Sequence, residues 1–273
     1  MANEEQLALL RKSVTDWNQW RSEHPAISPD LAGAVLTQVS LRGVNLSGAT
    51  LAKSNFVGAG LEEADLSGAD LSGANLSGVD FNGATLNGAI LKSANLLGAY
   101  LAGVSLVRVD LSNASLNRVD LTRSDVSESN LKGMSAIGAD LSRADLSNAN
   151  LEAVDLSRAE MGRVKLSGAR LVGANLNNAR LQGATLTNAD LTEANLSNTR
   201  LNRADLSGSC FKQANLESAT LLGANLTQAD LSNANLTDAN LSGADLTEAK
   251  LDGTILDAAT LSNATMPDEL LSH

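Results

Sequence analysis

An apolar residue returns at every fifth position of this chain, from Leu31 to Met266. Most of these residues are Leu, and the exceptions are Phe56, Phe81, Val126, Ala136, Met161, Phe211 and Met266. Two residues before each stands a small residue, nearly always Ala, and a polar residue lies between the two. A period of five fits no α-helix, because a helix repeats every 3.6 residues. The small–polar–Leu triplet instead predicts a short strand with two side chains on one face.

Glycine recurs at one position of the same pattern. All but Gly60 and Gly162 of the 22 glycines stand two residues after the Leu position, and Asn takes the place at several other repeats. A type II turn needs a positive φ at its third residue, which favours Gly and then Asn. The sequence therefore predicts a tight turn after each strand. Low-complexity disorder would not need this register, and the regular Leu supplies a core to bury.

Four strand-and-turn units close a coil of twenty residues if each turn is close to a right angle. Leu and Ala then point inward, and successive coils pair as parallel strands about 4.8 Å apart. We predict an all-β solenoid, a quadrilateral parallel β-helix of about twelve coils over residues 27–266. Within it, the coil 121–140 is expected to be the weakest, since Ser124, Ser129 and Ala136 leave its interior under-filled.

The segment 1–26 lacks the repeat and carries an apolar stripe at helical spacing, made of Leu7, Leu10, Val14 and Trp17. We predict one helix over residues 3–23 that caps the first coil, because solenoids need capped ends. Docking of a partner by this helix is the alternative. A C-terminal tail, 267–273, carries Leu270 and Leu271, which are expected to fold back over the last coil.

Composition narrows the function. The net charge of −11 disfavours general binding to nucleic acid or to an anionic membrane. The acidic N-terminus is unlike a signal peptide and no apolar run is long enough to span a bilayer, so a cytoplasmic protein is expected. We expect it to be a monomer or an end-to-end dimer. His24 and His273 lie at opposite ends, and Cys210 has no histidine near it in the repeat. We therefore expect no metal, no cofactor and no enzymatic activity.

Repeats such as Ala69-Asp70-Leu71-Ser72-Gly73 resemble the A-[DN]-L-x-x motif of the pentapeptide-repeat family, and the resemblance covers nearly all of the chain. It implies a right-handed quadrilateral β-helix, and the handedness comes from the resemblance alone. The leading segment is similar to N-terminal extensions of cyanobacterial members. Some relatives protect DNA gyrase from quinolones by imitating duplex DNA.

Charged residues form columns, because residues twenty apart stack on neighbouring coils. Asp120, Asp140 and Glu160 each stand three residues before an Arg, at Arg123, Arg143 and Arg163, and three ion pairs are expected there. The candidate binding site for an acidic protein partner is a basic patch, expected to lack such carboxylates and made of Arg163, Arg180, Arg200 and Arg203. A further column, which includes Asn175, Asn195 and Asn215, is expected to form an amide ladder.

Two hypotheses for the function follow. The first is a non-catalytic scaffold or regulator that binds another protein along one face. The alternative is a DNA mimic that modulates gyrase. Since B-DNA carries one charge per ~1.7 Å, a solenoid ~58 Å long would need on the order of 34 negative charges to imitate it. The chain carries far fewer, and its middle bears arginines, so the first hypothesis is favoured.

Overall fold

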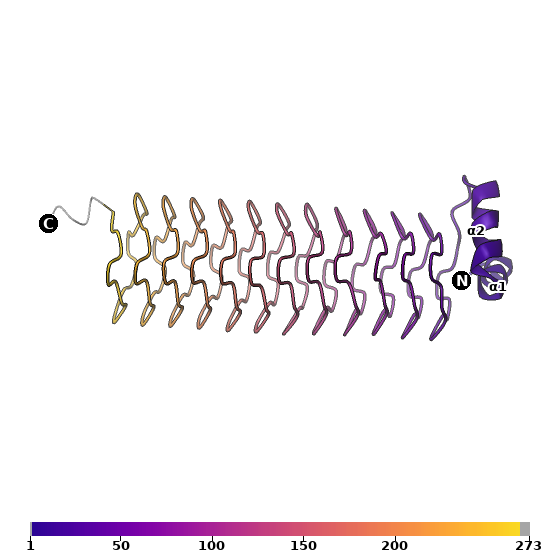
Figure 1. The fold of residues 1–273 in the computed structure, drawn as a ribbon, viewed down its shortest axis with the longest axis horizontal. Coiled ribbons are helices and arrows are strands. Elements are labelled where there is room, and N and C mark those ends of the chain that lie inside the picture. Colours follow the sequence, from indigo (N-terminus) through magenta and orange to yellow (C-terminus); the bar gives the residue numbers. More distant parts are fainter. Residues whose placement is uncertain (1, 268–273) are drawn as a thin grey trace. The chain divides into compact units, whose positions relative to one another are not determined.

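The computed structural model describes residues 2–267. The chain divides into two compact units, Met1–Ser135 and Ala136–His273. Two helices, α1 (Glu4–Lys12) and α2 (Val14–Glu23), belong to the first unit. Elsewhere both units consist of single-residue β-bridges joined by turns, which stack as coils (Figure 1).

The bridges give the register of the coils. In the first unit Asp30 pairs in parallel with Thr50 and Val35 pairs with Asn55, and in the second unit Asp140 pairs with Glu160. Bridged positions recur every five residues and their partners lie twenty residues away, which confirms the predicted coil of four strand-and-turn units. The fold is a parallel β-helix in each unit, with the polar position of every repeat in the bridge.

The interior is built from the predicted Leu and Ala positions. Phe56 and Phe81 in the first unit and Phe211 in the second are fully buried at Leu positions. Ala at the small position is buried from Ala34 to Ala249. Close packing of these few residue types explains why the pattern tolerates so little change, since interiors are packed to crystal-like density.

Every turn has the left-handed residue that the glycine register predicts. From residue 33 to residue 263, each residue at this register position has a φ between 54° and 72°, whether or not it is glycine. Asn occupies it at Asn148 and Asn178, as expected, but Arg occupies it at Arg163 and Arg203. A non-glycine residue in this conformation costs roughly 1–2 kcal/mol, so these arginines are held at an unfavourable backbone position.

The Asp or Asn at the polar position fixes the turn that follows it. Its Oδ1 atom accepts the backbone N–H two residues later, as Asp65 does from Ser67 at 2.9 Å and Asp140 does from Ser142 at 2.9 Å. This is the Asx-turn, in which the side chain replaces a backbone acceptor. The sequence pattern showed these residues but not this role.

At two polar positions that carry Ser, an Asn on the preceding coil supplies the missing oxygen. Asn87 Oδ1 accepts the Ser105 hydroxyl at 2.8 Å and the Val107 N–H at 2.9 Å. Asn117 Oδ1 accepts the Ser135 hydroxyl at 2.8 Å in the same way. The donor and acceptor residues stand eighteen apart in both cases, so one coil completes the turn of the next.

The predicted amide ladder forms within the second unit. Asn195 Nδ2 donates to Asn175 Oδ1 at 3.3 Å, and Asn235 Nδ2 donates to Asn215 Oδ1 at 3.2 Å. Asn175 in turn donates to Asp155 at 3.1 Å. These bonds connect coil to coil, which supports a structural role for the column.

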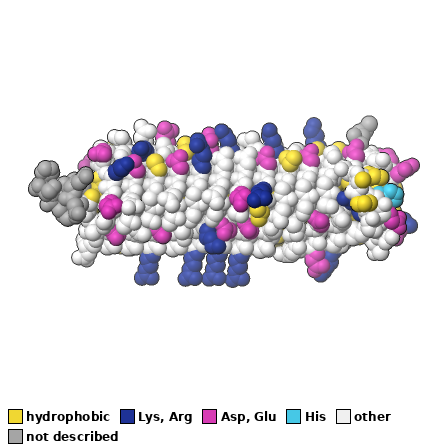
Figure 2. Space-filling view, turned by 90° about the horizontal axis from the view of Figure 1, so that it is seen from above, with side chains coloured by type: hydrophobic (Ala, Val, Ile, Leu, Met, Phe, Trp, Pro, Cys, Tyr) yellow, Lys and Arg dark blue, Asp and Glu magenta, His cyan; other side chains and the backbone are white. Residues whose placement is uncertain are grey.

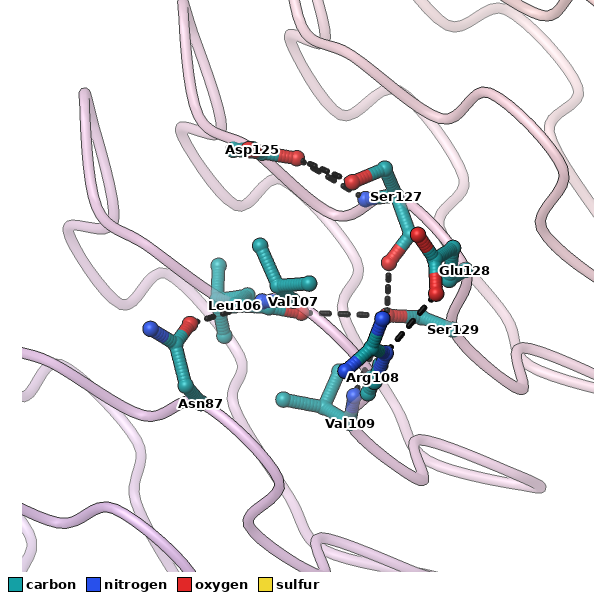
Figure 3. Close-up of polar contacts among 9 residues, drawn as sticks. All are labelled: Asn87, Leu106, Val107, Arg108, Val109, Asp125, Ser127, Glu128 and Ser129. Atoms are coloured by element: carbon teal, nitrogen blue, oxygen red, sulfur yellow. Dashed lines mark hydrogen bonds and ion pairs between the residues drawn. The ribbon is translucent and has the colours of Figure 1, made fainter.

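The serines expected to weaken the coil 121–140 are satisfied. Ser124 Oγ donates to the Leu121 carbonyl at 2.7 Å, although its side chain is buried. Ser129 Oγ accepts the Val109 N–H at 3.1 Å, and its hydroxyl is placed to donate to the Leu106 carbonyl at 3.0 Å or to the Ser127 carbonyl at 3.1 Å (Figure 3). When it donates to Leu106, the Ser129 hydroxyl bridges two backbone groups of the preceding coil. These hydroxyls therefore add no cost of an unsatisfied polar group, and the weakness expected of this coil stays a prediction that rests on its under-filled interior.

The prediction of one helix over residues 3–23 is also wrong. Ser13 is extended, with φ −165° and ψ 128°, and it ends α1 and begins α2. Its hydroxyl accepts the Asp16 N–H at 3.1 Å, so it is an N-cap. Leu7, Leu10 and Trp17 are nevertheless buried, whereas Val14 is partly exposed. Trp17 of α2 is fully buried, and its indole N–H donates to the Asn45 carbonyl of the first coil at 2.8 Å.

Candidate interaction surfaces

The basic patch lies in the second unit on two neighbouring positions of each coil. Arg180 forms a parallel bridge with Arg200, so both occupy the polar position of adjacent coils. Arg163 and Arg203 occupy left-handed turn positions, with φ of 58° and 57°. Both turn residues and Arg200 are exposed. Basic side chains project clear of the surface at several places (Figure 2).

The turn arginines of the patch lean along the stack. Arg163 Cγ lies 3.7 Å from the place that a Cβ would take on Gly183, and Arg203 Cγ lies 4.0 Å from that place on Gly223. Each stem therefore covers the bare turn of the following coil. In this column Gly183 lies between Arg163 and Arg203, and it contributes no side chain of its own.

The expected ion pairs do not form. Among the described residues Arg123, Arg143 and Arg163 have no carboxylate partner, and Glu160 pairs with Arg180 at 2.8 Å instead. Asp140 is occupied by the Ser142 N–H, and Asp120 Oδ1 accepts the Thr122 N–H at 2.9 Å. The arginines occupy turn positions and the acids occupy strand positions, and no salt bridge joins them within the described residues. Arg180 was expected to be unpaired, and this expectation is wrong.

The patch keeps a positive balance despite that pair. Within the described part of the chain, Arg163, Arg200 and Arg203 form no salt bridge. The side chains of the Arg180–Glu160 pair are about half exposed, 50% and 46%, and an exposed pair of this kind contributes about 0–1 kcal/mol. The patch therefore offers three uncompensated guanidinium groups and a fourth in a weak ion pair.

The N-terminal helices supply hydrogen-bond partners to the exposed edge of the first coil. Asn3 N–H donates to the Asp30 carbonyl at 2.7 Å, and the Trp17 indole donates to the Asn45 carbonyl at 2.8 Å. Asn18 Oδ1 accepts the Asn45 N–H at 2.9 Å. Unpaired strand edges invite further pairing, so these contacts satisfy an edge that would otherwise be open.

Arg21 holds α2 to the coils and was not singled out from the sequence. It is buried, and it donates to the carbonyls of Ile27 at 2.6 Å and Ser47 at 2.8 Å. Desolvation by burial lowers the pKa of the Arg21 guanidinium, against the opposing charge of Asp65. The signal available in the sequence was its position in the last turn of a helix, where a cation is favoured.

The described residues hold no cluster of three or more metal-binding side chains, and no helix among them is long and apolar enough to cross a membrane. Cys210 is partly buried, with its sulfur 3.3 Å from the Thr192 hydroxyl. It sits at a polar strand position and approaches no described histidine. Leu270 and Leu271 lie outside the described residues.

A family model for pentapeptide repeats matches the chain in eight copies, over residues 30–68, 54–92, 94–133, 137–171, 169–208, 209–247 and 239–267. The chain belongs to the pentapeptide-repeat family. It is accordingly a right-handed β-helical solenoid. Members of this family are generally structural or interaction proteins rather than enzymes.

Solved structures of other pentapeptide-repeat proteins resemble the chain. HetL, involved in heterocyst differentiation regulation in the cyanobacterium Nostoc sp. strain PCC 7120, is 32% identical over 92% of this chain and 97% of its own, with a TM-score of 0.33. Rfr23 from the cyanobacterium Cyanothece 51142 is 32% identical over 45% of this chain and 90% of its own, with a TM-score of 0.19.

QnrB1, a plasmid-mediated fluoroquinolone resistance protein, is 19% identical over 63% of this chain and 86% of its own, with a TM-score of 0.38. No curated protein sequence gives a significant match. The repeat itself therefore carries the family assignment, and it leaves the partner to be argued from the surface.

Proposed function

We propose that this pentapeptide-repeat protein is a non-catalytic interaction protein that binds an acidic partner protein through Arg163, Arg180, Arg200 and Arg203. The observation that carries the proposal is the positive charge that these arginines gather without matching carboxylates. Arg163, Arg200 and Arg203 form no salt bridge among the described residues, and Arg180 forms a parallel bridge with Arg200. Like charges directly opposite each other on neighbouring strands are destabilising, so a role in binding explains this pair better than a role in packing.

The chemistry of arginine specifies the partner. A guanidinium group donates two parallel hydrogen bonds to one carboxylate, which a lysine cannot do. The patch is positive although the net charge of the chain is −11. Its local potential therefore attracts acidic groups, whereas the net charge of the protein repels them. We expect a partner with clustered Asp or Glu side chains.

Affinity capture with three forms of the protein tests the proposal. The parent, a variant with Arg163, Arg200 and Arg203 changed to Gln, and a control with Lys53, Lys92 and Arg118 changed to Gln are compared at low and high salt. The control residues are exposed and form no salt bridge among the described residues. A partner that the parent and the control retain equally, and that the patch variant loses, supports the proposal.

We also infer that α1 and α2 cap a solenoid of about twelve coils, because they supply hydrogen-bond donors to its first edge.

The basic patch argues against the alternative function, which is DNA mimicry directed at gyrase, because exposed arginines carry the opposite charge to the phosphates that a mimic would imitate. Unchanged gyrase supercoiling in the presence of the protein is the expected result, and inhibition would favour the alternative.

A further inference from the structure

The first coil presents four strand positions to the N-terminal helices, and one of them is left open. Asp30 and Asn45 each receive a partner for both backbone groups, and Val35 receives the Arg11 guanidinium on its carbonyl at 2.9 Å. At Ser40 neither the N–H nor the carbonyl has a hydrogen-bond partner among the described residues. Among the described residues, dedicated groups thus satisfy two strand positions fully and the carbonyl of a third, and they leave both backbone groups of the fourth exposed.

The open position extends to both neighbouring turns. In the coils that follow, the carbonyls of Val57 and Glu62 accept from the preceding coil. The equivalent carbonyls of the first coil, Thr37 and Arg42, have no partner within the described chain. The edge around Ser40 thus offers three acceptors and one donor, of which the Ser40 N–H and carbonyl lie at a strand position and the other two carbonyls lie in turns.

A hollow lies directly over this edge. Its volume is about 260 Å³. It is lined by residues 10–14 of the N-terminal segment and, on the first coil, by Leu36, Val39, Ser40 and Leu41. Val39 occupies an inward position and is nevertheless partly exposed, whereas Val44 at the next such position is fully buried. Ser13, the extended residue between α1 and α2, is part of the lining.

The lining mixes polar and apolar surface, with somewhat more polar surface exposed. Val14 and Val39 are partly exposed and provide apolar surface, and Arg11 and Lys12 are the charged residues. No Asp or Glu lines the hollow, although Lys12 pairs with Asp16 at 2.9 Å on the exposed side of α2. The charge complement is an acidic occupant, and the apolar surface suits one aliphatic side chain.

We propose that this hollow binds an extended acidic segment of a partner protein, which adds a strand to the solenoid at Ser40. The Ser40 N–H and carbonyl pair with the backbone of the segment, an aliphatic side chain enters the hollow, and a carboxylate lies beside Arg11 or Lys12. β-Strand addition obtains affinity from the main chain and specificity from pockets for alternate side chains, which is the combination found here. The site lies in the first unit and does not depend on the basic patch.

A library of randomised eight-residue peptides, selected on the full-length protein, tests the proposal. Enriched peptides should combine acidic residues with an aliphatic residue. Each is then made in two forms, one unmodified and one N-methylated at alternate amides, which keeps the side chains but removes main-chain donors. Binding of the unmodified form should slow hydrogen exchange of the Ser40 amide, and N-methylation should weaken binding at least about tenfold, the loss of about 1.4 kcal/mol.

Variants of the protein locate the site. Val14→Trp should fill the hollow and abolish binding, and Lys12→Gln should weaken it, while Lys92→Gln on a distant coil of the first unit should have no effect. Unchanged far-ultraviolet circular dichroism and melting temperature show that the variants remain folded. Failure to enrich any peptide, equal binding by the N-methylated form, or equal binding to Val14→Trp would each overturn the proposal.

Discussion

Arg180 and Arg200 form a parallel β-bridge, so two guanidinium-bearing residues occupy the same position on adjacent coils. Glu160, one coil earlier, pairs with Arg180, and no described carboxylate pairs with Arg200. Like charges directly opposite each other on neighbouring strands are destabilising. An arrangement that costs stability and serves no packing is a reasonable place to look for a binding function.

The turn arginines provide a test in which stability and binding move in opposite directions. Changing both Arg163 and Arg203 to Gly relieves about 1–2 kcal/mol of strain at each position. The greater conformational entropy of glycine in the unfolded chain offsets about 0.5–1 kcal/mol of each gain, so we expect stability to rise by about 1–2 kcal/mol in total. Binding of the acidic partner should weaken. Gln213→Gly is the matched control, since Gln213 has a φ of 58° and lies off the patch. It should stabilise the fold, as measured by thermal unfolding, without changing binding.

The hydroxyl of Ser129 should matter more than that of Ser124. Ser129→Ala leaves the Val109 N–H and the Leu106 carbonyl without their bridge, so we expect a loss of about 1–3 kcal/mol. In Ser124→Ala the Leu121 carbonyl still accepts the Ser124 N–H at 3.1 Å, and the loss should be only about 0.5–1.5 kcal/mol. Urea unfolding measures both, and equal losses would contradict the bridging role of Ser129.

Asn87 offers a test of the turn that spans two coils. Asn87→Ala removes the acceptor used by the Ser105 hydroxyl and the Val107 N–H, and should cost about 1–2 kcal/mol. Adding Ser105→Asn should restore most of the loss, because an Asn at that position can accept the Val107 N–H itself, as Asn75 accepts the Ser77 N–H. Lack of rescue in urea unfolding would show that Asn87 acts in some other way.

Trp17 should be the residue on which the N-terminal segment depends. Its side chain is fully buried, so Trp17→Ala should destabilise the first unit by about 3–5 kcal/mol. Trp20 is partly exposed and stacks on His24, with ring centroids 5.4 Å apart, so Trp20→Ala should cost less.

Deleting residues 1–25 should leave folded coils that associate end to end. A monodisperse truncated protein in light scattering, with unchanged melting, would contradict a capping role.

Acid should weaken the second unit through its Asx-turns. The Thr247 hydroxyl, and with it the Thr247 N–H, lowers the pKa of the Asp245 carboxyl below its usual 3.8. The stability this contributes is present above the unfolded pKa and is lost as the pH falls through the lower folded value. Asp245→Asn should flatten the dependence below about pH 4, since Asn240 makes the same turn with Ser242. Melting temperatures at several acidic pH values check this.

The period of five, the inward residues and the left-handed turns could all be read from the sequence, because each is imposed by short-range geometry. The break at Ser13 could not be read, since the stripe of Leu7, Leu10 and Trp17 fits one helix as well as two. The choice depends on how the helices meet the coil edge. Sequence spacing alone does not show that edge.

The twenty-residue register predicts where the charged residues of the patch lie, but it does not predict which of them form ion pairs. Glu160 lies three residues from Arg163 and twenty from Arg180, and only the second arginine is within reach. Direction decides this, because Arg163 leaves the coil at a turn while Glu160 and Arg180 stand on the same strand face. The hollow at Ser40 was also missed, since it is defined by partners that other edge residues have and Ser40 lacks.

The partnership of Asn87 with Ser105 also bears on how such a chain can lengthen during evolution. The backbone alone would accept the duplication of a single five-residue unit, because every unit has the same turn and strand. Inserting five residues between Asn87 and Ser105 would move the two side chains to different faces and leave the Val107 N–H unsatisfied. Duplications of twenty residues preserve such partnerships wherever they fall. We therefore expect natural length variants of this protein to differ by whole coils.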